Sequence, residues 1–246
     1  MSIIHRGWRF FKFRLKDLPL VWKFTDPHQR WLYKHRYLRM DANETINDRA
    51  RRQFHKDRYV FARDTLRAAG FSQAKILDCA CGTGYGSAIL KEAVSQVVGV
   101  DIDQEAVHYA TSKYGASSIN FKQADVTQMK SLEKNSFDAA VSFETIEHIS
   151  EPLLFLENIH ALLKSNGLLI ISTPNKWGPT RDHRFDYDYA LFRQHLEKFF
   201  SIEEMYVQNS GCMDLWVNRG ASRRLIKATS DTIEQAECFL AVCRKR

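Results

Sequence analysis

Residues 76–87, Ile76-Leu77-Asp78-Cys79-Ala80-Cys81-Gly82-Thr83-Gly84-Tyr85-Gly86-Ser87, decide the fold. An apolar run ends in an acid, a glycine-spaced turn follows, and the next residues are apolar again, which predicts a strand, a sharp turn and a helix. Gly82 and Gly84 permit backbone conformations that a side chain would forbid, and they let a ligand lie against the main chain at the positive end of the helix. In the dinucleotide fingerprint G-x-G-x-x-G the third glycine falls later than Gly86 does here. The stretch therefore predicts a nucleotide-type site, and its neighbours must identify the ligand.

The size and composition of the chain predict one catalytic domain with an extension. The 246 residues are 44% hydrophobic, enough for one core and an appendage of some forty residues. We assign residues 1–40 to a basic aromatic arm and residues 41–246 to the catalytic domain. There is no apolar run of about 18 residues and no apolar leader segment, which predicts a protein that neither spans a membrane nor is secreted.

The cysteines favour a reducing compartment. Their number is odd, and the one close pair is C-x-C rather than a zinc or redox spacing: Cys79, Cys81, Cys212, Cys238 and Cys243. We interpret them as reduced thiols of a cytoplasmic protein.

The arm carries the excess positive charge. Residues 1–40 have a net charge of +8 and nine aromatic side chains, whereas the other 206 residues have a net charge of −1. Ile4, Trp8, Phe11 and Leu15 follow helical spacing up to Pro19, which predicts a basic amphipathic helix. Three partners fit such a helix: an anionic membrane surface at the inner face of the membrane, the catalytic domain or a second subunit of a homodimer, and single-stranded nucleic acid.

The rest of the chain alternates strands with helices. After a polar connector at 41–52 we expect a helix at 53–69, ended by Gly70. Strands are predicted at 76–79, 97–101, 119–122, 137–143 and 168–172, and helices at 86–93, 104–113 and 153–163. A helix at 191–199 and strands at 202–207 and 238–243 follow. The pattern predicts a doubly wound, Rossmann-like α/β sheet of about seven strands, parallel except for the last.

Three acids follow successive strands. Asp78, Asp101 and Asp125 stand where the first three predicted strands end. The carboxyl ends of parallel strands share one edge of the sheet, where ligands bind. An acid after the second strand suits the two hydroxyls of a ribose, and Asp125 is placed to meet an adenine amino group. NAD and S-adenosylmethionine both carry that ribose, so the glycine spacing has to separate them.

With these motifs the chain resembles class I S-adenosylmethionine-dependent methyltransferases from Arg58 to Arg244. The matching stretches occur in order: Ile76–Gly84, Val98–Asp103 (VGVDID), Ala124–Val126, Phe137–Pro152 (FDAAVSFETIEHISEP) and Leu163–Asn175 (LKSNGLLIISTPN). Five motifs in order make the resemblance specific. Ala80 departs from it, because the family often has glycine there; a methyl group should narrow the turn.

The resemblance also implies which residues bind the cofactor. Gly82 and Gly84 would line its methionine portion, and Asp78 would orient the amino-acid end. Asp101 would hold the ribose, with Ile102 beside it. The remaining contacts would come from a residue that covers the cofactor, two that flank the adenine and one at the end of the fourth strand: Tyr59, Asp125, Val126 and Phe143.

Methyl transfer to an oxygen requires alignment and removal of a proton from the acceptor. Glu144, Glu147 and His148 follow the fourth strand and would share one face of a helical turn, while His183 follows the fifth strand. E-x-x-E-H with a later D-H resembles the two-Glu, two-His metal site of small-RNA 2′-O-methyltransferases and ubiquinone-biosynthesis O-methyltransferases. That resemblance implies a divalent ion, such as Mg²⁺, Mn²⁺, Fe²⁺ or Zn²⁺. Two alternatives stay open: His148 as a metal-free base, with Glu147 in the same catalytic turn, and acids that only satisfy a helix start.

The acceptor is predicted by a narrower resemblance. The stretches ACGTGYGS at 80–87, HKDRYVFA at 55–62 and ECFLAVCRK at 237–245 are similar to bacterial methyltransferases of surface-polysaccharide and lipopolysaccharide biosynthesis. We expect O-methylation of a saccharide hydroxyl, on a polysaccharide or a glycolipid. The alternatives are an RNA 2′-hydroxyl, which the neutral catalytic part disfavours, a quinone or catechol, and a scaffold that binds the cofactor without catalysis.

Overall fold

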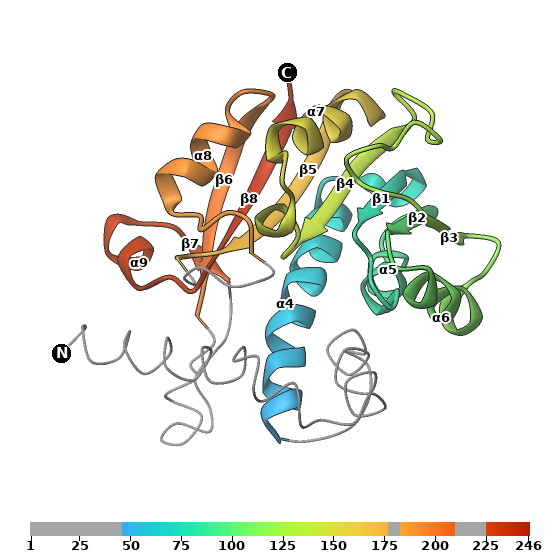
Figure 1. The fold of residues 1–246 in the computed structure, drawn as a ribbon, viewed down its shortest axis with the longest axis horizontal. Helices are drawn as coiled ribbons and strands as arrows, with labels where there is room; N and C mark the ends of the chain where they lie inside the picture. Colours follow the sequence, from blue (N-terminus) through green and yellow to red (C-terminus); the bar gives the residue numbers. More distant parts are fainter. Residues whose placement is uncertain (1–45, 177–182, 210–224) are drawn as a thin grey trace, which may run out of the picture.

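A single twisted sheet forms the centre of the molecule (Figure 1). The computed structural model describes residues 46–176, 183–209 and 225–246. Within them the sheet has eight strands in the order β3-β2-β1-β4-β5-β8-β6-β7. Their bounds are Lys75–Cys79 (β1), Gln96–Asp101 (β2), Ile119–Gln123 (β3), Phe137–Phe143 (β4), Leu163–Pro174 (β5), Phe200–Gln208 (β6), Ile226–Lys227 (β7) and Cys238–Lys245 (β8).

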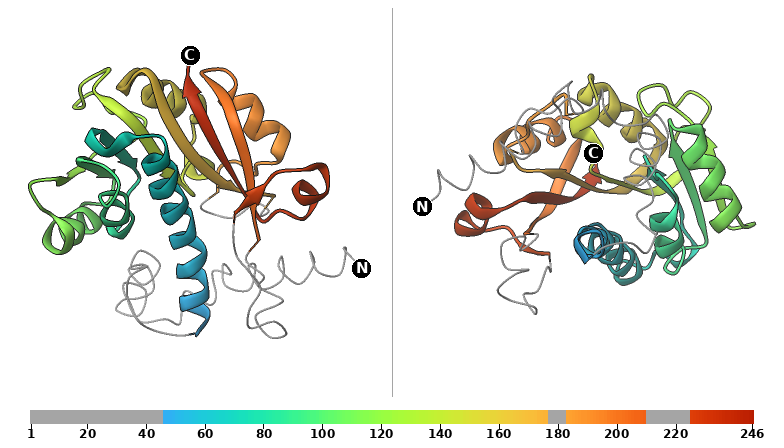
Figure 2. Two further views of the ribbon diagram at one scale, coloured as in Figure 1. Left: turned by 180° about the vertical axis from the view of Figure 1, so that it is seen from behind. Right: turned by 60° about the horizontal axis from the view of Figure 1, so that its bottom comes forward.

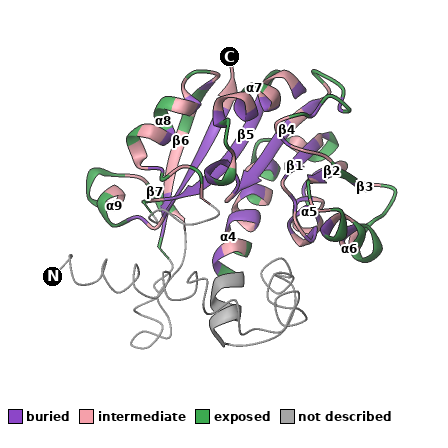
Figure 3. Ribbon diagram, viewed as in Figure 1, coloured by how far each residue is buried: buried purple, intermediate pink, exposed green. Residues whose placement is uncertain are grey.

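Helices cover both faces of the sheet, as the two further views in Figure 2 show. Buried side chains of α4 and α6 pack against one face and those of α7 and α8 against the other, so each face has its own apolar core. The helices are Ile46–Ala68 (α4), Tyr85–Leu90 (α5), Gln104–Tyr114 (α6), Pro152–Leu162 (α7), Tyr189–Leu196 (α8) and Ser230–Gln235 (α9), with 3₁₀ turns at Phe71–Gln73 (η1) and Ile146–His148 (η2). The central strands are buried on both sides (Figure 3), as expected for a parallel sheet between two helical layers.

The parallel half confirms the expected fold. β1 pairs in parallel with β2 and β4, β2 with β3, and β4 with β5. Helices connect β1 to β2, β2 to β3 and β4 to β5. The chain order reverses beside β1, which lies between β2 and β4, and this is the switch point where open α/β sheets bind ligands.

The closing half confirms the antiparallel last strand and adds one short strand. β8 inserts between β5 and β6 and runs antiparallel to both. The additional strand is β7, which pairs over two residues with β6. The short helix α9, whose Thr229 and Thr232 form a capping box, precedes β8.

Two predicted boundaries are wrong. Helix α4 begins at Ile46, so it includes most of the segment predicted as a polar connector. Strand β5 begins at Leu163, before the predicted turn at Asn166-Gly167. Its pairing with β4 jumps from Leu163 to Leu168, and Asn166 has a left-handed φ of 60°, so the turn forms an irregularity inside the strand.

The basic arm at residues 1–40 lies outside the described residues, so its predicted helix and partners stay predictions. In the part of the chain that the structure describes, no helix has the length and apolar character needed to cross a bilayer.

Candidate donor and acceptor sites

The glycine turn after β1 has the backbone geometry that its sequence predicts. Gly82 and Gly84 have left-handed φ angles of 53° and 80°. A Cβ on Gly84 would lie 2.7 Å from Phe121 and Ala110, so this glycine is also required by packing. A Cβ on Gly82 would meet no atom within 4 Å, so the main chain there is accessible to a ligand. Ala80 also has a left-handed φ, 61°, a conformation that costs an alanine about 1–2 kcal/mol.

The third glycine of the turn makes room for an aromatic ring. A Cβ on Gly86 would lie 2.1 Å from the ring of Tyr59 on α4. The Tyr59 ring packs edge-on against Phe143 and Tyr85, with centroids 4.9 and 5.4 Å away. The glycine at position 86, which the dinucleotide pattern does not require, is therefore needed to make room for the Tyr59 ring, which packs against the turn.

Asp78 links the turn to α4. Its carboxylate accepts hydrogen bonds from the hydroxyl groups of Tyr59 (3.2 Å) and Ser87 (2.6 Å). The side chain is fully buried, and burial raises its pKa to about 7. Both oxygens are thus occupied by protein groups, and direct contact with the amino-acid end of a cofactor stays a prediction.

Asp101 joins the end of β2 to the glycine turn. One carboxylate oxygen accepts a hydrogen bond from the Gly82 N–H (2.8 Å) and the other from the Asp103 N–H (2.9 Å). Burial, the largest cause, raises its pKa. The next residue, Ile102, is 66% exposed although it is large and apolar. This combination of a bound acid and an uncovered apolar side chain suits a ribose and an attached base.

Asp125 has a structural partner as well as its predicted role. Its Oδ1 accepts hydrogen bonds from the N–H and the hydroxyl of Thr127, at 2.8 and 2.7 Å, which closes a turn after β3. The adjacent Val126 is buried in the core. A contact of either residue with adenine stays a prediction.

Two buried hydroxyl groups near this edge have no partner within the described residues. They belong to Thr83, between the two glycines of the turn, and to Ser142, near the end of β4. Thr83 was missed in the sequence, although its position between Gly82 and Gly84 is the available signal. An unpaired buried hydroxyl is costly unless water or a ligand satisfies it.

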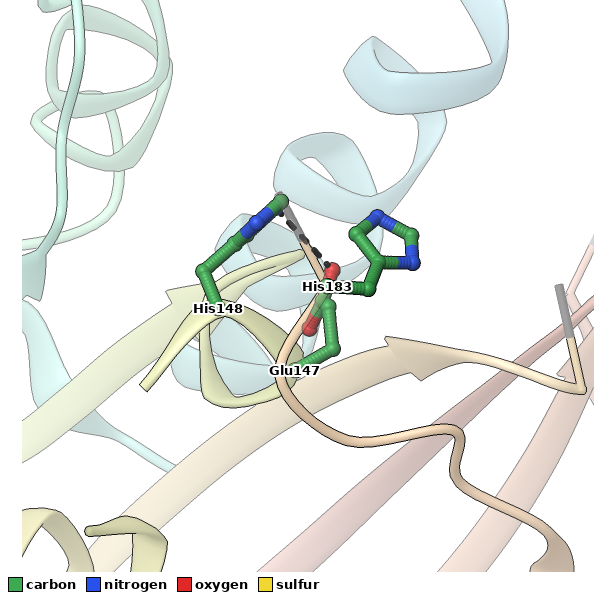
Figure 4. Close-up of side chains that lie close together, drawn as sticks. All are labelled: Glu147, His148 and His183. Atoms are coloured by element: carbon green, nitrogen blue, oxygen red, sulfur yellow. Dashed lines mark ion pairs between the residues drawn. The ribbon is translucent and has the colours of Figure 1, made fainter. Parts of the chain in front are cut away.

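Three of the four predicted acceptor-side residues lie together (Figure 4). Ligand atoms of Glu147, His148 and His183 lie within 4.8 Å of one another. The carboxylate of Glu147 is 3.7 Å from His148 Nε2, and the two imidazole rings are 4.7 Å apart. The Glu147 carbonyl accepts hydrogen bonds from the N–H groups of Arg184 and Phe185, which brings the segment of His183 to η2.

The environment of Glu147 differs from that of the histidine beside it. Glu147 is 1% exposed and accepts a hydrogen bond from the Thr173 hydroxyl at 3.3 Å. Burial, and secondarily the charge of Glu144, raises the pKa of Glu147 well above its usual range. The side chain of His148 is 42% exposed. The pair therefore combines a buried acid with a solvent-accessible imidazole.

Glu144 does not join this cluster. The expectation that it shares one helical face with Glu147 and His148 is wrong, because η2 begins after it and Glu144 has a left-handed φ of 51°. Its carboxylate forms an ion pair with Arg58 of α4 and accepts a hydrogen bond from the Ser172 hydroxyl at 3.2 Å. Ser172 and Thr173 are consecutive in β5 and point to opposite faces of the sheet. The hydroxyl groups that bind Glu144 and Glu147 thus lie on different faces of the sheet.

The three clustered residues fit a divalent ion. A carboxylate and two imidazoles are ligand types that such ions bind, and their ligand atoms lie within 4.8 Å of one another. Glu144, engaged by Arg58, does not fit as a fourth ligand in this arrangement.

Comparisons with known proteins find similarity to methyltransferases. Residues 77–171 match a family model described as a methyltransferase domain. A probable S-adenosylmethionine-dependent methyltransferase of Mycobacterium tuberculosis is 34% identical over 109 residues, which cover 44% of this chain and 39% of the relative. A ubiquinone biosynthesis O-methyltransferase of Xanthomonas campestris is 31% identical over 120 residues, 48% of each chain. The chain thus spans about half or less of these relatives.

The same fold occurs in solved methyltransferase structures. An N-methyltransferase from Bradyrhizobium japonicum, in complex with S-adenosyl-L-homocysteine, superposes with a TM-score of 0.59 at 18% identity, covering 84% of this chain and 90% of that one. The protein therefore has the Rossmann-like fold of class I methyltransferases. Its residues 77–171 are those that match the methyltransferase domain.

Proposed function

We propose that this protein is an S-adenosylmethionine-dependent methyltransferase that acts on a hydroxyl group. The main support is the hydrogen bond from the Gly82 N–H to the Asp101 carboxylate. It connects the acid proposed to bind the ribose with a glycine turn whose main chain is accessible at Gly82. Both lie at the switch point of the sheet, where such folds bind ligands. The similarity of residues 77–171 to methyltransferase domains supports it.

Binding of S-adenosyl-L-homocysteine tests the donor site. We expect Asp101→Ala to weaken binding about 10- to 150-fold, the range for a charged hydrogen bond of about 1.5–3 kcal/mol. Isothermal titration calorimetry measures this. Asp138→Ala is the control, because Asp138 accepts a hydrogen bond from the Lys75 N–H at the opposite edge of the sheet. Equal affinity of wild type and Asp101→Ala would contradict the donor site.

The acceptor-side cluster provides a path for the proton. We propose that His148, which is exposed at the end of η2, takes the proton as the acceptor oxygen attacks the methyl group. The Glu147 carboxyl group, 3.7 Å from His148 Nε2, would orient the ring, and in its ionised form it would also stabilise the imidazolium. Thr173 in turn holds Glu147. The residues of this chain thus supply a base and the group that orients it.

As the alternative to a metal-free base, we propose that Glu147, His148 and His183 hold a divalent ion. A bound ion would act as a Lewis acid that makes the acceptor hydroxyl more acidic. Titration of Mg²⁺, Mn²⁺ and Zn²⁺ into wild type and His183→Ala tests this site directly. We expect His183→Ala to lose metal binding and most of its activity, and chelation to inactivate the wild type. If activity survives both changes, the metal has no role and His148 acts as a metal-free base.

For the acceptor we propose a saccharide hydroxyl on a surface polysaccharide or lipid-linked glycan. The motifs at 55–62, 80–87 and 237–245 support this acceptor, as they are similar to polysaccharide-associated methyltransferases. Mass spectrometry of surface glycan from cells with and without the protein tests it, and the expected change is 14 Da per lost methyl group. An unchanged glycan would contradict it.

A second candidate acceptor is a catechol-type small molecule. The similarity to a ubiquinone biosynthesis O-methyltransferase and the clustered Glu147, His148 and His183 favour it. Turnover of a catechol but of no saccharide would select this alternative. An RNA 2′-hydroxyl is less well supported, because residues 41–246 carry a net charge of −1.

We propose that the basic arm brings the enzyme to an anionic membrane surface. Its excess of eight positive charges and its nine aromatic side chains support this location. Co-sedimentation with phosphatidylglycerol vesicles would measure it, and we expect a protein without residues 1–40 to remain in the supernatant. Unchanged co-sedimentation would leave the arm to pack on the domain or on a second subunit.

A further inference from the structure

We propose that Arg58 is a positioning residue for the acceptor side of the site, acting through Glu144. This inference rests on the proposed methyl transfer. Arg58 and Tyr59 are neighbours on α4, and one turn of this helix would then hold both halves of the site: Tyr59 the donor turn through Asp78, and Arg58 the segment 144–148 through Glu144.

Arg58 is the largest fully buried side chain of the described residues, and its contacts converge on the ends of three strands. Its Nη1 donates to the hydroxyl of Ser172 in β5 (3.2 Å) and to the thiol sulfur of Cys238 in β8 (3.3 Å), and it forms the ion pair with Glu144 after β4. Its Nη2 donates to His55 Nδ1 (2.9 Å), so the two terminal nitrogens of the planar guanidinium bind acceptors in different directions, whereas a lysine has one nitrogen there. An arginine therefore makes contacts on two sides that the single nitrogen of a lysine would not reproduce.

Glu144 is held in a conformation that depends on these contacts. It is one of only a few residues other than glycine with a left-handed φ among those described. Such a residue persists when its surroundings fix it. The Ser172 hydroxyl both accepts a hydrogen bond from the Glu144 N–H (3.3 Å) and donates to the Glu144 carboxylate (3.2 Å), which Arg58 also binds.

The consequence extends to the catalytic pair. The chain turns at Glu144 and enters η2 two residues later, so the direction of this turn sets where Glu147 and His148 point. Release of Glu144 would therefore misalign these two side chains without any change to the donor residues Asp101 and Gly82. The expected signature is a loss in kcat with little change in affinity for the donor.

Two variants test this role. Arg58→Lys keeps the charge but lacks the guanidinium fork. The pair Arg58→Met with Glu144→Gln removes both charges, so that no unpaired buried charge is left to prevent folding. We expect kcat to fall about 10- to 100-fold in the double variant and less in Arg58→Lys, the range for a misplaced catalytic group. The dissociation constant for S-adenosyl-L-homocysteine should stay within about threefold.

The matched control lies on the same helix. Arg63→Met removes an arginine that pairs with Asp64 and Glu92 at the surface, and we expect wild-type kcat. Hydrogen exchange of the peptide around 143–149 gives a readout that does not need activity. In both Arg58 variants we expect this peptide to exchange at least tenfold faster than in wild type, while peptides of β1 and β2 keep their protection.

The outcomes separate this inference from the proposed function. Unchanged kcat and unchanged exchange in the folded double variant would overturn the role of Arg58. Loss of donor affinity in parallel with kcat would also overturn it, since it would indicate a general structural role. If the wild type neither binds S-adenosyl-L-homocysteine nor transfers a methyl group, the proposed function fails, and the exchange measurement still decides whether Arg58 holds the turn.

Discussion

Individual side chains explain why the glycine turn has the sequence it has. Gly84 avoids Phe121 and Ala110, and Gly86 avoids the ring of Tyr59, so two of the glycines serve packing as much as ligand access. The sequence predicted the turn and Asp101, because both follow a local pattern. It did not predict the role of Gly86, because this role depends on Tyr59 of α4, which lies 27 residues earlier in the chain.

At Asp78, the buried carboxyl makes stability depend on pH. Its pKa is raised from 3.8 to about 7 in the folded protein, so the folded state binds more protons than the unfolded state between these values. The contribution of Asp78 to the free energy of unfolding is fully present below about pH 4. It is lost as the pH rises to about 7, and the loss is on the order of a few kcal/mol. Urea denaturation from pH 4 to 8 should show Asp78→Asn gaining stability relative to wild type across this window.

The control for this prediction is Asp64→Asn. Asp64 is exposed on α4, and its hydrogen bond with Arg63 lowers its pKa. Relative to wild type, this variant should not gain stability as the pH rises. A pH-independent difference between wild type and Asp78→Asn would show that Asp78 does not titrate in this range.

At Gly86, a single methyl group should disturb the donor site. Gly86→Ala would press against the Tyr59 ring, and overpacking of this kind costs about 1–3 kcal/mol. We expect lower stability and weaker S-adenosyl-L-homocysteine binding, measured by urea denaturation and calorimetry. In a Tyr59→Ala background the same substitution should cost much less, because the ring is gone. Equal costs in both backgrounds would refute the contact.

The short 3₁₀ turn η2 determines which of the predicted acceptor-side residues lie together. The spacing of Glu144, Glu147 and His148 predicted one helical face, but η2 includes only residues from Ile146 onward. A left-handed residue other than glycine has no reliable signal in the sequence, so the separation of the two acids could not be predicted. The proximity of His183 to His148 was predicted correctly, because both follow strands that end at the same edge.

Neighbouring residues of β5 offer a test of this division. Thr173→Val removes the hydroxyl group that bonds to buried Glu147, and Ser172→Ala removes the one that bonds to Glu144. We expect each to lower stability by about 1–3 kcal/mol. In Ser172→Ala we expect the peptide that contains Glu144 to exchange its amide hydrogens faster than in wild type. In Thr173→Val we expect the peptide that contains Arg58 to exchange at the wild-type rate. Identical exchange patterns in the two variants would contradict two separately held acids.

Over the whole molecule, the sequence predicts the parallel half better than the closing half. The strands β1 to β5 and their helices follow local sequence signals, namely the periodicity of apolar residues and the glycines and prolines at element boundaries. Their order in the chain was therefore predicted correctly. The insertion of β8 between β5 and β6 depends on pairing between distant segments, which a local pattern does not encode. The two-residue strand β7 is too short to have a pattern of its own.

The buried thiols have a practical consequence. Cys79, Cys81, Cys238 and Cys243 are all buried, and burial raises the pKa of each thiol above its usual range. Alkylating reagents attack the thiolate, so these four should stay unmodified while the native packing is closed. Cys81 lies in the donor turn and Cys238 against Arg58. The alkylation rate of Cys81, measured peptide by peptide, would therefore report how often the donor turn opens. The rate at Cys238 would report the same for the region around Arg58, and neither measurement requires a substitution.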